Sequence, residues 1–507
     1  MSPNRIKRWI IPALLAVLLA CAALSFLLLR PKSDPVQALQ SVETELLRRS
    51  GGSGAGLDGA LNDAWRRCFS LRADGPFTQT LRSASGSVTA TMLNQKRLTA
   101  GLSDEMQRLL DERAAGASRR SELCTEDGAL RPELCDTLYD TAVRSRLSHA
   151  EDYCESQSMP VTLRYEHGAW ELEDASALLS LPVLSPNPGY DESVSALETP
   201  RLHYSLPLTG PGPVPDPACY GETDDPQEIM RLLESPAAQS LINGQKLDFD
   251  PARDMLGRPI YYYLDETILA LVWQQDEHGA VGTFAEVIIA DGSQLRRKLA
   301  DDSFGAYQYY YPSEFAAQTN AVLACSGDFY NSGRPDYGLY VYEGRLMRSC
   351  LYAGQSCLFT EDGDMLFVYE NQFADTEEAQ RFIDENRVKF SLSFGPVMID
   401  RGTDVTPYDY YFGEVLDTYA RCAVGQLGER HYLMMTINCE SPDHYVYVTL
   451  RQAADSMIAH GCFNAYTLDG GQTGSILIGG RLINPVQFGA ERQMSDIFYF
   501  ATALPNE

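Results

Sequence analysis

Apolar positions along the chain recur at two spacings, one typical of helices and one typical of strands. In residues 36–155 the spacing is mainly helical, and the longest predicted helix runs from Leu130 to His149. Residues 161–172 alternate between apolar and polar and predict a β-hairpin. From about residue 255, short β-like runs alternate with a few helices. The pattern predicts a smaller, mainly helical α+β domain followed by a larger α+β (mixed α/β) C-terminal domain.

The segment from Trp9 to Leu29 is a run of 21 residues without a charge. At 1.5 Å per residue, a helix of this length crosses the hydrocarbon core of a bilayer. Three basic residues at positions 5–8 favour a cytoplasmic N-terminus. A cleaved signal peptide and a lipid-modified Cys21 are the alternatives, but the apolar run continues past Cys21. We therefore expect a single-pass protein of the cell membrane whose C-terminal domains are extracellular.

Proline and glycine concentrate between about residues 183 and 228, which is the composition of a linker. A helical stretch from Pro226 to Leu241 follows before the strands resume. The predicted organisation is residues 1–35 as the cytoplasmic tip and transmembrane anchor, 36–182 as an accessory domain, 183–254 as a Pro/Gly-rich linker with a short helical stretch, and 255–507 as the C-terminal domain.

The net charge of −28 limits the partners of the chain. Nucleic acid is excluded as a partner, because a polyanion is normally bound by a basic face. Some of the carboxylates could instead hold Ca²⁺ or another divalent cation, which requires several oxygen ligands around one point. The chain has no EF-hand loop, so the sequence assigns neither a metal nor another cofactor, and it does not indicate an oligomeric state.

Four cysteines ahead of residue 160 form an even set, which comprises Cys68, Cys124, Cys135 and Cys154. In an oxidising exterior such residues can pair. Two disulfide bridges are therefore expected in the accessory domain, with a connectivity that the sequence does not specify.

The segment from Ala465 to Ser475 contains the strongest candidate for a functional site. An apolar run ends at Asp469, and Gly470 and Gly471 then let the backbone turn and present N–H groups to a ligand. A predicted helix with a capping box precedes this run, and a predicted hairpin follows it and would return the chain beside the first strand. Because Asp and Gly also form ordinary turns, the tripeptide alone does not identify a site.

Five short blocks stand out between about residues 255 and 505. They are Asn320 to Tyr330, Phe394 to Ile399, Arg421 to Gly425, Cys462 to Thr473, and Glu491-Arg492 with Ser495-Asp496. In this order they resemble the conserved blocks of the phosphodiester glycosidase family. Two positions depart from the family pattern: Ser326 stands where the family usually has Asn, and Asn438-Cys439-Glu440 stands where many members have Asp-Gly-Arg.

The resemblance implies hydrolysis of glycosyl-1-phosphodiester bonds, such as those of N-acetylglucosamine-1-phosphodiesters, in surface or extracellular glycans. This reaction needs a carboxylate near an oxocarbenium-like centre and cations at the phosphate, for which arginine forks are suited. The candidate catalytic residues are Asp469, Asp328, Arg421 and Arg492, and the candidate substrate-binding residues are Gly470, Gly471, Gln472, Thr473, Ser326 and Asn331.

Other interpretations stay open beside this one. Asp469 could act as a general base, a nucleophile or a metal ligand. The missing Asp-Gly-Arg block allows a non-catalytic module that binds an anionic cell-surface polysaccharide. The four-cysteine accessory domain allows a scaffold that docks a partner, and the role of residues 36–182 cannot be inferred from the sequence.

Overall fold

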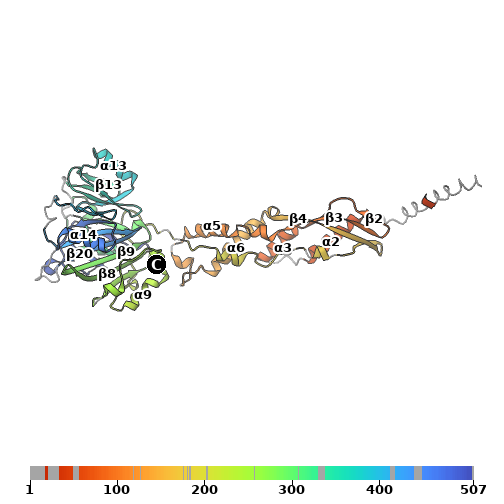
Figure 1. The fold of residues 1–507 in the computed structure, drawn as a ribbon, viewed down its shortest axis with the longest axis horizontal. Coiled ribbons are helices and arrows are strands. Elements are labelled where there is room, and N and C mark those ends of the chain that lie inside the picture. The colour runs from red at the N-terminus through yellow and green to blue at the C-terminus, as the bar shows by residue number, and fades with distance from the viewer. Residues whose placement is uncertain are drawn as a thin grey trace, which may run out of the picture. The chain divides into compact units, whose positions relative to one another are not determined.

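The computed structural model of the chain describes residues 18–20, 34–49, 56–117, 119–125, 127–174, 176–179, 181, 184–200, 202, 204–255, 257–305, 308–328, 337–410, 417–438 and 448–504. They form two compact units (Figure 1). The first unit comprises residues 1–113 and 130–200, and the second comprises residues 114–129 and 201–507.

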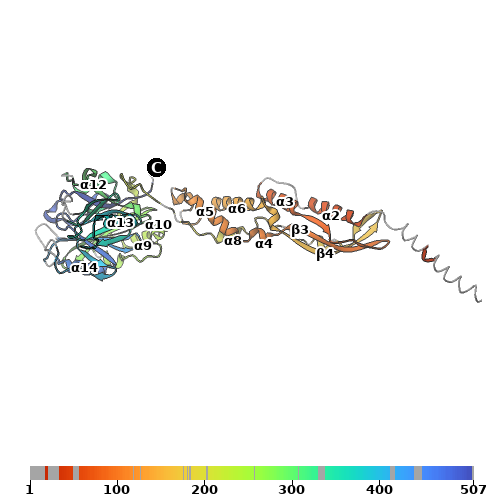
Figure 2. The same cartoon turned by 90° about the horizontal axis from the view of Figure 1, so that it is seen from above.

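The first unit combines an antiparallel sheet with helices, of which α2 (Pro35–Arg49) and α3 (Leu57–Cys68) lie against the sheet (Figure 2). The sheet has the order β1 (Ser70–Ala73), β3 (Ser83–Leu93), β4 (Cys154–Glu166) and β5 (Ala169–Leu172), and β2 (Thr78–Gln79) pairs with β3. The helices are α2 (Pro35–Arg49), α3 (Leu57–Cys68), α4 (Gln95–Thr99), α5 (Leu102–Ala114), α6 (Pro132–Leu147), η2 (Ala150–Tyr153), α7 (Ser176–Leu179) and α8 (Tyr190–Ser195). The predicted helix from Leu130 to His149 is confirmed as α6, and the predicted hairpin is confirmed as β4 and β5.

This unit contains more sheet than its periodicity predicted. Residues 70–93, which were included in the mainly helical segment, form β1, β2 and β3, and β3 pairs with β4 along its whole length. In β3 the core positions are Ala84, Val88, Ala90 and Met92, whereas Ser and Thr occupy positions 85, 87, 89 and 91. Small alanines beside hydroxyl residues give little apolar contrast, so the period of two was missed.

The second unit is built on three antiparallel sheets. The largest has the order β18 (Thr403–Asp404), β17 (Val397–Asp400), β21 (Asn464–Leu468), β19 (Arg421–Gly428), β20 (His431–Asn438), β9 (Ala280–Ile289), β8 (Ile268–Glu277), β7 (Ile260–Leu264) and β6 (Tyr220–Thr223). The second has the order β10 (Leu295–Leu299), β24 (Asp496–Phe500), β11 (Leu323–Ser326), β22 (Ile476–Ile478) and β23 (Arg481–Leu482). The third has the order β13 (Arg345–Ser349), β12 (Leu339–Tyr342), β16 (Val388–Leu392), β14 (Ser356–Thr360) and β15 (Met365–Val368).

Helices complete this unit. They are α9 (Pro226–Glu234), α10 (Pro236–Ile242), α11 (Pro251–Asp254), α12 (Pro312–Thr319), α13 (Thr376–Glu385) and α14 (Leu450–Ala459), with the short 3₁₀ turns η1 (Arg120–Glu122), η3 (Pro217–Cys219), η4 (Gly292–Gln294), η5 (Ala300–Asp302) and η6 (Gln487–Gly489). Because every strand pairing in the described part of this unit is antiparallel, the unit has an α+β fold rather than a parallel α/β fold.

The nine-stranded sheet is covered on both faces. Along β8, Leu269, Leu271 and Trp273 pack into one core with α9, α10 and α14. Ile268, Ala270 and Val272 alternate with them and pack into a second core with the two five-stranded sheets. Burial on both faces explains why this strand is continuously apolar at its start instead of alternating. Figure 1 shows α9 and α14 beside β8 and β20.

The hairpin after Asp469 lies in a different sheet from the one predicted. Its strands β22 and β23 form as expected around Gly479-Gly480, but β22 pairs with β11 and not with β21. β21 pairs with β17 and β19 in the nine-stranded sheet. The segment between β21 and β22 therefore crosses from one sheet to another. A local apolar pattern indicates a strand but not its partner, which explains the error.

Residues 204–254 of the predicted linker are folded into the second unit. They supply β6, which pairs with β7, and three helices, α9, α10 and α11. The predicted transmembrane segment from Trp9 to Leu29 lies outside the described residues apart from helical residues 18–20. Among the helices that the structure describes, none combines the length and the apolar character needed to cross a bilayer.

The two disulfides expected among Cys68, Cys124, Cys135 and Cys154 are absent from the structure, in which none of these four described cysteines is paired in a disulfide. Cys68, Cys135 and Cys154 carry free thiols, and Cys154 is hydrogen bonded to Cys68. Burial and this contact raise the pKa of the Cys154 thiol to about 12. The two thiols lie at the end of α3 and the start of β4. Even numbers of cysteines show only that pairing is permitted, not that it occurs.

Arg146 joins α6 to the segment that links α4 and α5. Its guanidinium donates to the carbonyl oxygens of Leu98 at 2.6 Å and Ala100 at 2.8 Å, and to Glu105 Oε2 at 2.9 Å. The Arg146 side chain is 9% exposed. If it were removed, water would have little access to donate hydrogen bonds to these carbonyl and carboxylate oxygens. We expect Arg146→Ala to lower the free energy of unfolding of the first unit by about 3 kcal/mol, measured by urea denaturation of the full chain.

Arg144 on the same helix is the matched control. It pairs with Asp140 at 2.7 Å, but both side chains are more than 40% exposed. Arg144→Ala should cost about 0.5 kcal/mol or less. Equal losses for the two variants would contradict the assigned role of Arg146.

Candidate functional site

The loop of residues 469–475, called the Asp469 loop below, connects β21 in the nine-stranded sheet to β22 in the sheet that contains β11. Asp469 directly follows β21 and is partly exposed. α14 precedes β21 with the predicted capping box, in which Thr449 accepts from the Gln452 N–H. The predicted helix, strand and loop are therefore confirmed in their order, and they place Asp469 at the rim of the sheet.

Gly470 fits closely against the neighbouring strand. A Cβ atom at this position would lie 1.9 Å from the carbonyl oxygen of Ala420 and 3.2 Å from Arg421 Cα. Gly471 has φ +68°, in the left-handed region that favours glycine. Gly470 is required because the backbone approaches β19 closely, and Gly471 is required because the chain turns there. Together the two glycines hold the loop against the start of β19.

Side chains close the turn of the Asp469 loop and tie the loop to two other segments. Thr473 Oγ1 donates to the Gly470 carbonyl at 2.5 Å, which closes the turn. Asn438 Nδ2 donates to the Gly471 carbonyl at 2.9 Å, and Gln472 Nε2 donates to the Ala490 carbonyl at 3.1 Å. Asn438 begins the block that departs from the family pattern, and here it supports the loop. Cys439 and Glu440 lie outside the described residues.

The two candidate arginines differ in exposure. Arg421 is 9% exposed, and its guanidinium donates to the carbonyl oxygens of Asp417 at 2.7 Å and Val448 at 3.2 Å. Its backbone packs against Gly470, so it lies beside the Asp469 loop. Arg492 is exposed. It lies two residues after Ala490, whose carbonyl oxygen accepts the hydrogen bond from Gln472. The structure therefore brings the chain segments of both arginines to the same loop.

Ser326 lies inside the protein beneath the loop. It is 1% exposed, and its N–H donates to the Ser475 carbonyl at 3.1 Å. Its hydroxyl accepts from the Ser475 N–H at 3.4 Å and lies 3.3 Å from Cys422 Sγ. Ser326 thus joins the end of β11 to the start of β22 and, through Cys422, to β19. In this position it supports the loop from below.

Asp328 is held by a buried network two residues further on. Its Oδ2 accepts from the N–H of Ser393 at 2.9 Å and from the hydroxyl of Ser393 at 2.8 Å, and lies 3.4 Å from Arg297. The N–H of Asp328 donates to Asp496 Oδ1 at 3.1 Å. Asp328 is 4% exposed, so its carboxylate is oriented mainly by protein donors.

Arg297 and Asp496 form the centre of this network. Arg297 Nε donates to Asp496 Oδ2 at 2.6 Å, and its guanidinium lies 4.3 Å from the centre of the Tyr340 ring. Burial raises the pKa of Asp496, an effect that Arg297 opposes and Asp328 reinforces. Burial also acts to lower the pKa of Arg297, but Asp496, Tyr340 and Asp328 outweigh it, so this pKa is raised. Arg297 and Asp496 are both buried and lie 2.5 Å apart, so each side chain provides the main compensation for burial of the other.

Sequence reasoning did not find Arg297 or the role of Asp496. They lie 199 positions apart, on neighbouring strands β10 and β24. Arg297 stands in an ordinary-looking Leu-Arg-Arg-Lys-Leu run, where an inward-pointing arginine has no local signature. Asp496 belongs to the fifth block, and its position at the start of a fully buried strand was the available signal.

One candidate cannot be placed, because Asn331 lies outside the described residues. No group of three or more His, Cys, Asp or Glu side chains in the described part of the chain is arranged to hold a metal ion. The candidate residues that can be placed gather at one rim, where β11, β20 and β21 end and where β19, β22 and β24 begin. Such a rim can present a carboxylate, loop N–H groups and arginines to an anionic ligand.

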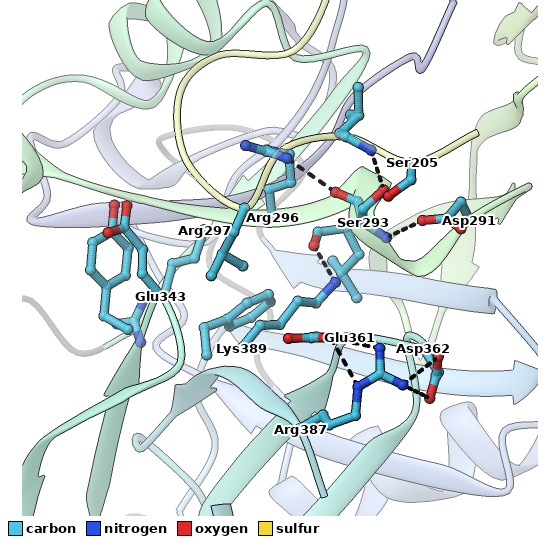
Figure 3. Close-up of a pocket in the computed structure, with 15 residues that line it drawn as sticks. Ser205, Asp291, Ser293, Arg296, Arg297, Glu343, Glu361, Asp362, Arg387 and Lys389 are labelled. Carbon is cyan, nitrogen blue, oxygen red and sulfur yellow. Dashed lines mark hydrogen bonds and ion pairs between the residues drawn. The ribbon is translucent and has the colours of Figure 1, made fainter. Parts of the chain in front are cut away.

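A cavity of about 300 Å³ lies elsewhere in the second unit (Figure 3). It is lined by Ser205, Leu206, Leu208, Asp291, Ser293, Leu295, Arg296, Arg297, Tyr342, Glu343, Glu361, Asp362, Arg387, Lys389 and Phe390. Lys389 is 5% exposed, and its Nζ donates to the carbonyl oxygens of Gly292 and Leu295. Burial, reinforced by Arg296, lowers the pKa of Lys389 to about 7.

Comparison with known proteins confirms the resemblance inferred from the five blocks. Residues 319–501 match the family model of the phosphodiester glycosidases. The SPbeta prophage-derived uncharacterized protein YomE of Bacillus subtilis (strain 168) is 24% identical over 185 residues. That match covers 36% of this chain and 28% of the relative, so the chain spans less than a third of the length of this curated relative.

Two solved structures are similar at low identity. One is the catalytic domain of zebrafish N-acetylglucosamine-1-phosphodiester alpha-N-acetylglucosaminidase, auto-inhibited by its pro-peptide, with 17% identity and a TM-score of 0.37 over 47% of this chain and 84% of that chain. The other is a hypothetical protein from Synechocystis, with 13% identity and a TM-score of 0.34 over 48% of this chain and 64% of that chain.

The contact at Gly470 predicts a strong effect of a single methyl group. A Cβ atom 1.9 Å from the Ala420 oxygen forces the Asp469 loop away from β19. Gly470→Ala should therefore lower the free energy of unfolding of the second unit by about 3 kcal/mol, measured by thermal and urea denaturation of the full chain.

Gly474 in the same loop provides the matched control. A Cβ atom there would lie 3.5 Å from Cys422 Cβ, an ordinary contact. Gly474→Ala should change the stability by about 1 kcal/mol or less. If Gly470→Ala is no more harmful than Gly474→Ala, the close approach of the loop to β19 is wrong.

Lys389 predicts a dependence of stability on pH. Between pH 7 and about 10.4 the unfolded chain keeps a lysine proton that the folded chain releases, so this group makes folding more favourable as the pH rises. The charged groups around it are Arg296, Asp291, Glu361 and Asp362. The stability of the wild type relative to Lys389→Met should increase from pH 7 to 9, by up to about 1.4 kcal/mol per pH unit, in urea denaturation.

Met365→Leu, a buried substitution between uncharged residues on β15, serves as the control. Its stability relative to the wild type should not change over the same pH range. A constant difference between the wild type and Lys389→Met would show that the folded protein keeps Lys389 protonated.

Proposed function

We propose that the second unit hydrolyses glycosyl-1-phosphodiester bonds in surface or extracellular glycans. The observation that carries this proposal is the match of residues 319–501 to the phosphodiester glycosidases, which spans Asp328, Arg421, Asp469 and Arg492. Their common rim in the fold supports it, because a phosphodiester needs cations at the phosphate and a carboxylate near the anomeric carbon.

Exposure distinguishes the roles proposed for the two aspartates. Asp469 is partly exposed and precedes two glycines, so it can approach a bound sugar. Asp328 is nearly buried, and its Oδ2 accepts from both the N–H and the hydroxyl of Ser393. We assign the reacting carboxylate to Asp469 and a positioning role at the rim to Asp328.

The phosphate is proposed to bind at Arg421 and Arg492, beside the N–H groups of the Asp469 loop. Arg421 is oriented by the carbonyl oxygens of Asp417 and Val448. Arg492 is exposed and lies two residues after Ala490, whose carbonyl oxygen accepts from Gln472 in the loop. The leaving group is a phosphomonoester, which needs charge stabilisation more than protonation. Binding energy at the arginines would therefore lower the barrier directly.

The location of the protein forms part of the same proposal. The uncharged segment from Trp9 to Leu29 supports a single membrane anchor with a cytoplasmic N-terminus. Both folded units would then lie outside the cell, where surface glycans are the available substrates. Addition of divalent cations and treatment with a chelator test whether the reaction uses a metal ion.

A second candidate function is a module that binds an anionic cell-surface polysaccharide without cleaving it. The observation that favours it is the presence of Asn438-Cys439-Glu440 where many relatives have Asp-Gly-Arg. Asn438 here holds the Gly471 carbonyl and so takes part in shaping the loop. Under this alternative, the protein retains the polymer and releases no sugar.

The test is turnover of an N-acetylglucosamine-1-phosphodiester by the full chain in detergent, with release of the free sugar as the readout. Asp469→Asn should lower kcat/KM by about 100-fold or more, since it removes the carboxylate without changing its shape. Arg421→Ala should reduce kcat/KM by a comparable factor through the loss of phosphate binding.

Asp400→Asn is the matched control. Asp400 is also a partly exposed aspartate at the end of a strand of the nine-stranded sheet, and it accepts from the hydroxyl of Tyr369 at 2.9 Å. Its rate should stay close to that of the wild type. Equal rates for Asp469→Asn and wild type across several sugar phosphodiesters would remove Asp469 from the mechanism, and retention of polymer without turnover would establish the second function.

A further inference from the structure

The cavity in Figure 3 is separate from the Asp469 loop. Its wall includes Lys389 on β16, whereas Ser393, which holds Asp328, follows four positions later at the other end of that strand. At about 3.3 Å per residue, this spacing corresponds to roughly 13 Å. A ligand in the cavity would therefore lie away from the Asp469 loop, although Arg297 lines the cavity and also contacts Asp328 at 3.4 Å.

The cavity is closed on one side by residues 205–208. The N–H of Leu206 donates to Ser293 Oγ at 2.8 Å, and Arg296 donates to the carbonyl oxygens of Pro207 at 2.7 Å and Gly210 at 2.8 Å. These bonds hold the segment over the start of β10. Hydrogen bonds within the second unit therefore fix this wall of the cavity.

The charges that line the cavity balance. Four carboxylates face it, those of Asp291, Glu343, Glu361 and Asp362, and the lining contains four basic side chains. The lowered pKa of Lys389 changes this balance by at most one charge. An ionic ligand would be attracted by one set of groups and repelled by the other, so the balance favours a neutral ligand.

The basic side chains are already engaged. Arg387 lies 2.6 Å from Glu361 and 3.3 Å from Asp362, and Figure 3 shows it between them. Lys389 donates to two carbonyl oxygens, and Arg297 is paired with Asp496. Such groups keep spare lone pairs and hydrogen atoms for a neutral ligand, and they are poorly placed to neutralise a free phosphate or carboxylate.

Within the part of the chain that the structure describes, the Glu343 carboxylate makes no hydrogen bond or ion pair. It directly follows Tyr342 and has φ +50°, an uncommon value for a non-glycine residue. An acceptor of this kind suits a ligand hydroxyl group. Phe390 and Leu206 add apolar surface beside it.

We propose that this cavity is a second glycan-binding site that takes one or two neutral sugar residues. Sugar hydroxyl groups both donate and accept hydrogen bonds, so they match a lining of paired acidic and basic side chains. The apolar face of a pyranose ring matches the aromatic rings and leucine side chains of the same lining. The volume of about 300 Å³ is at the lower end of small-molecule sites, which suits a mono- or disaccharide. The proposal rests on the proposed function in that both sites serve one glycan.

In this arrangement the cavity holds a neutral part of the polymer while the Asp469 loop cleaves a phosphodiester elsewhere along it. A second contact raises the local concentration of the scissile bond without entering the chemistry. Its loss would therefore raise KM for a long substrate and leave kcat unchanged.

The test is binding of N-acetylglucosamine, N,N′-diacetylchitobiose and cellobiose to the full chain, by saturation-transfer NMR and calorimetry. The detergent must not carry a sugar headgroup. At least one of the three should bind, and Glu343→Ala and Arg387→Ala should each weaken it about tenfold, the effect of losing a hydrogen bond to a charged group. Both variants should cleave a small soluble phosphodiester at the wild-type rate.

Arg481→Ala is the matched control, because Arg481 forms a similarly exposed ion pair with Glu222 at 2.8 Å outside the cavity. It should bind the sugar as the wild type does. The proposal is overturned if none of the three sugars binds, or if binding is unaffected by Glu343→Ala and Arg387→Ala. An absence of turnover together with binding that depends on Glu343 and Arg387 would reject the proposed activity and leave the second site standing.

Discussion

The buried ion pair between Arg297 and Asp496 is the interaction on which the arrangement of the second unit depends. Removing two charges from water costs several kilocalories per mole, and only close pairing with further hydrogen bonds offsets that cost. Here the further bonds come from the N–H of Asp328 and the carbonyl oxygen of Ser391. One pair therefore connects β10, β24, β11 and β16, which belong to two different sheets.

Two separate sets of protein contacts orient the proposed catalytic rim. Asp328 receives its orientation from Ser393 and from the Arg297 pair, and the Asp469 loop receives its own from Gly470 against β19. The two anchors are independent of each other. The fold can thus keep the reactive segment in place while leaving Asp469 itself partly open to solvent.

Local elements of this unit could be predicted because their signals are short-range. Thr449 and Gln452 mark the start of α14, the apolar run before Asp469 marks β21, and Gly479-Gly480 marks a hairpin. What could not be predicted is the assignment of strands to sheets. The hairpin pairs with β11, roughly 150 positions earlier, and apolar alternation carries no information on such a partner.

The candidate site shows the same division. The five ordered blocks identified the loop and its arginines, because such family motifs consist of residues at the site. They do not show which other residues pack around the site. The partners that hold those residues, Arg297 and Ser393, escaped notice because they belong to strands with no motif of their own. The cavity around Lys389 was invisible for a similar reason, since its lining is assembled from five separate segments of the chain.

The Asp469 loop is the covalent link between two sheets, and this has a thermodynamic consequence. Its first residue follows β21 in one sheet, and its last precedes β22 in the other. A ligand that binds the loop only in its folded form stabilises the contact between the sheets as well as the loop itself. Occupancy of the rim would then appear as a cooperative rise in the melting temperature of the whole unit, so calorimetry without any enzymatic assay can screen for the natural ligand.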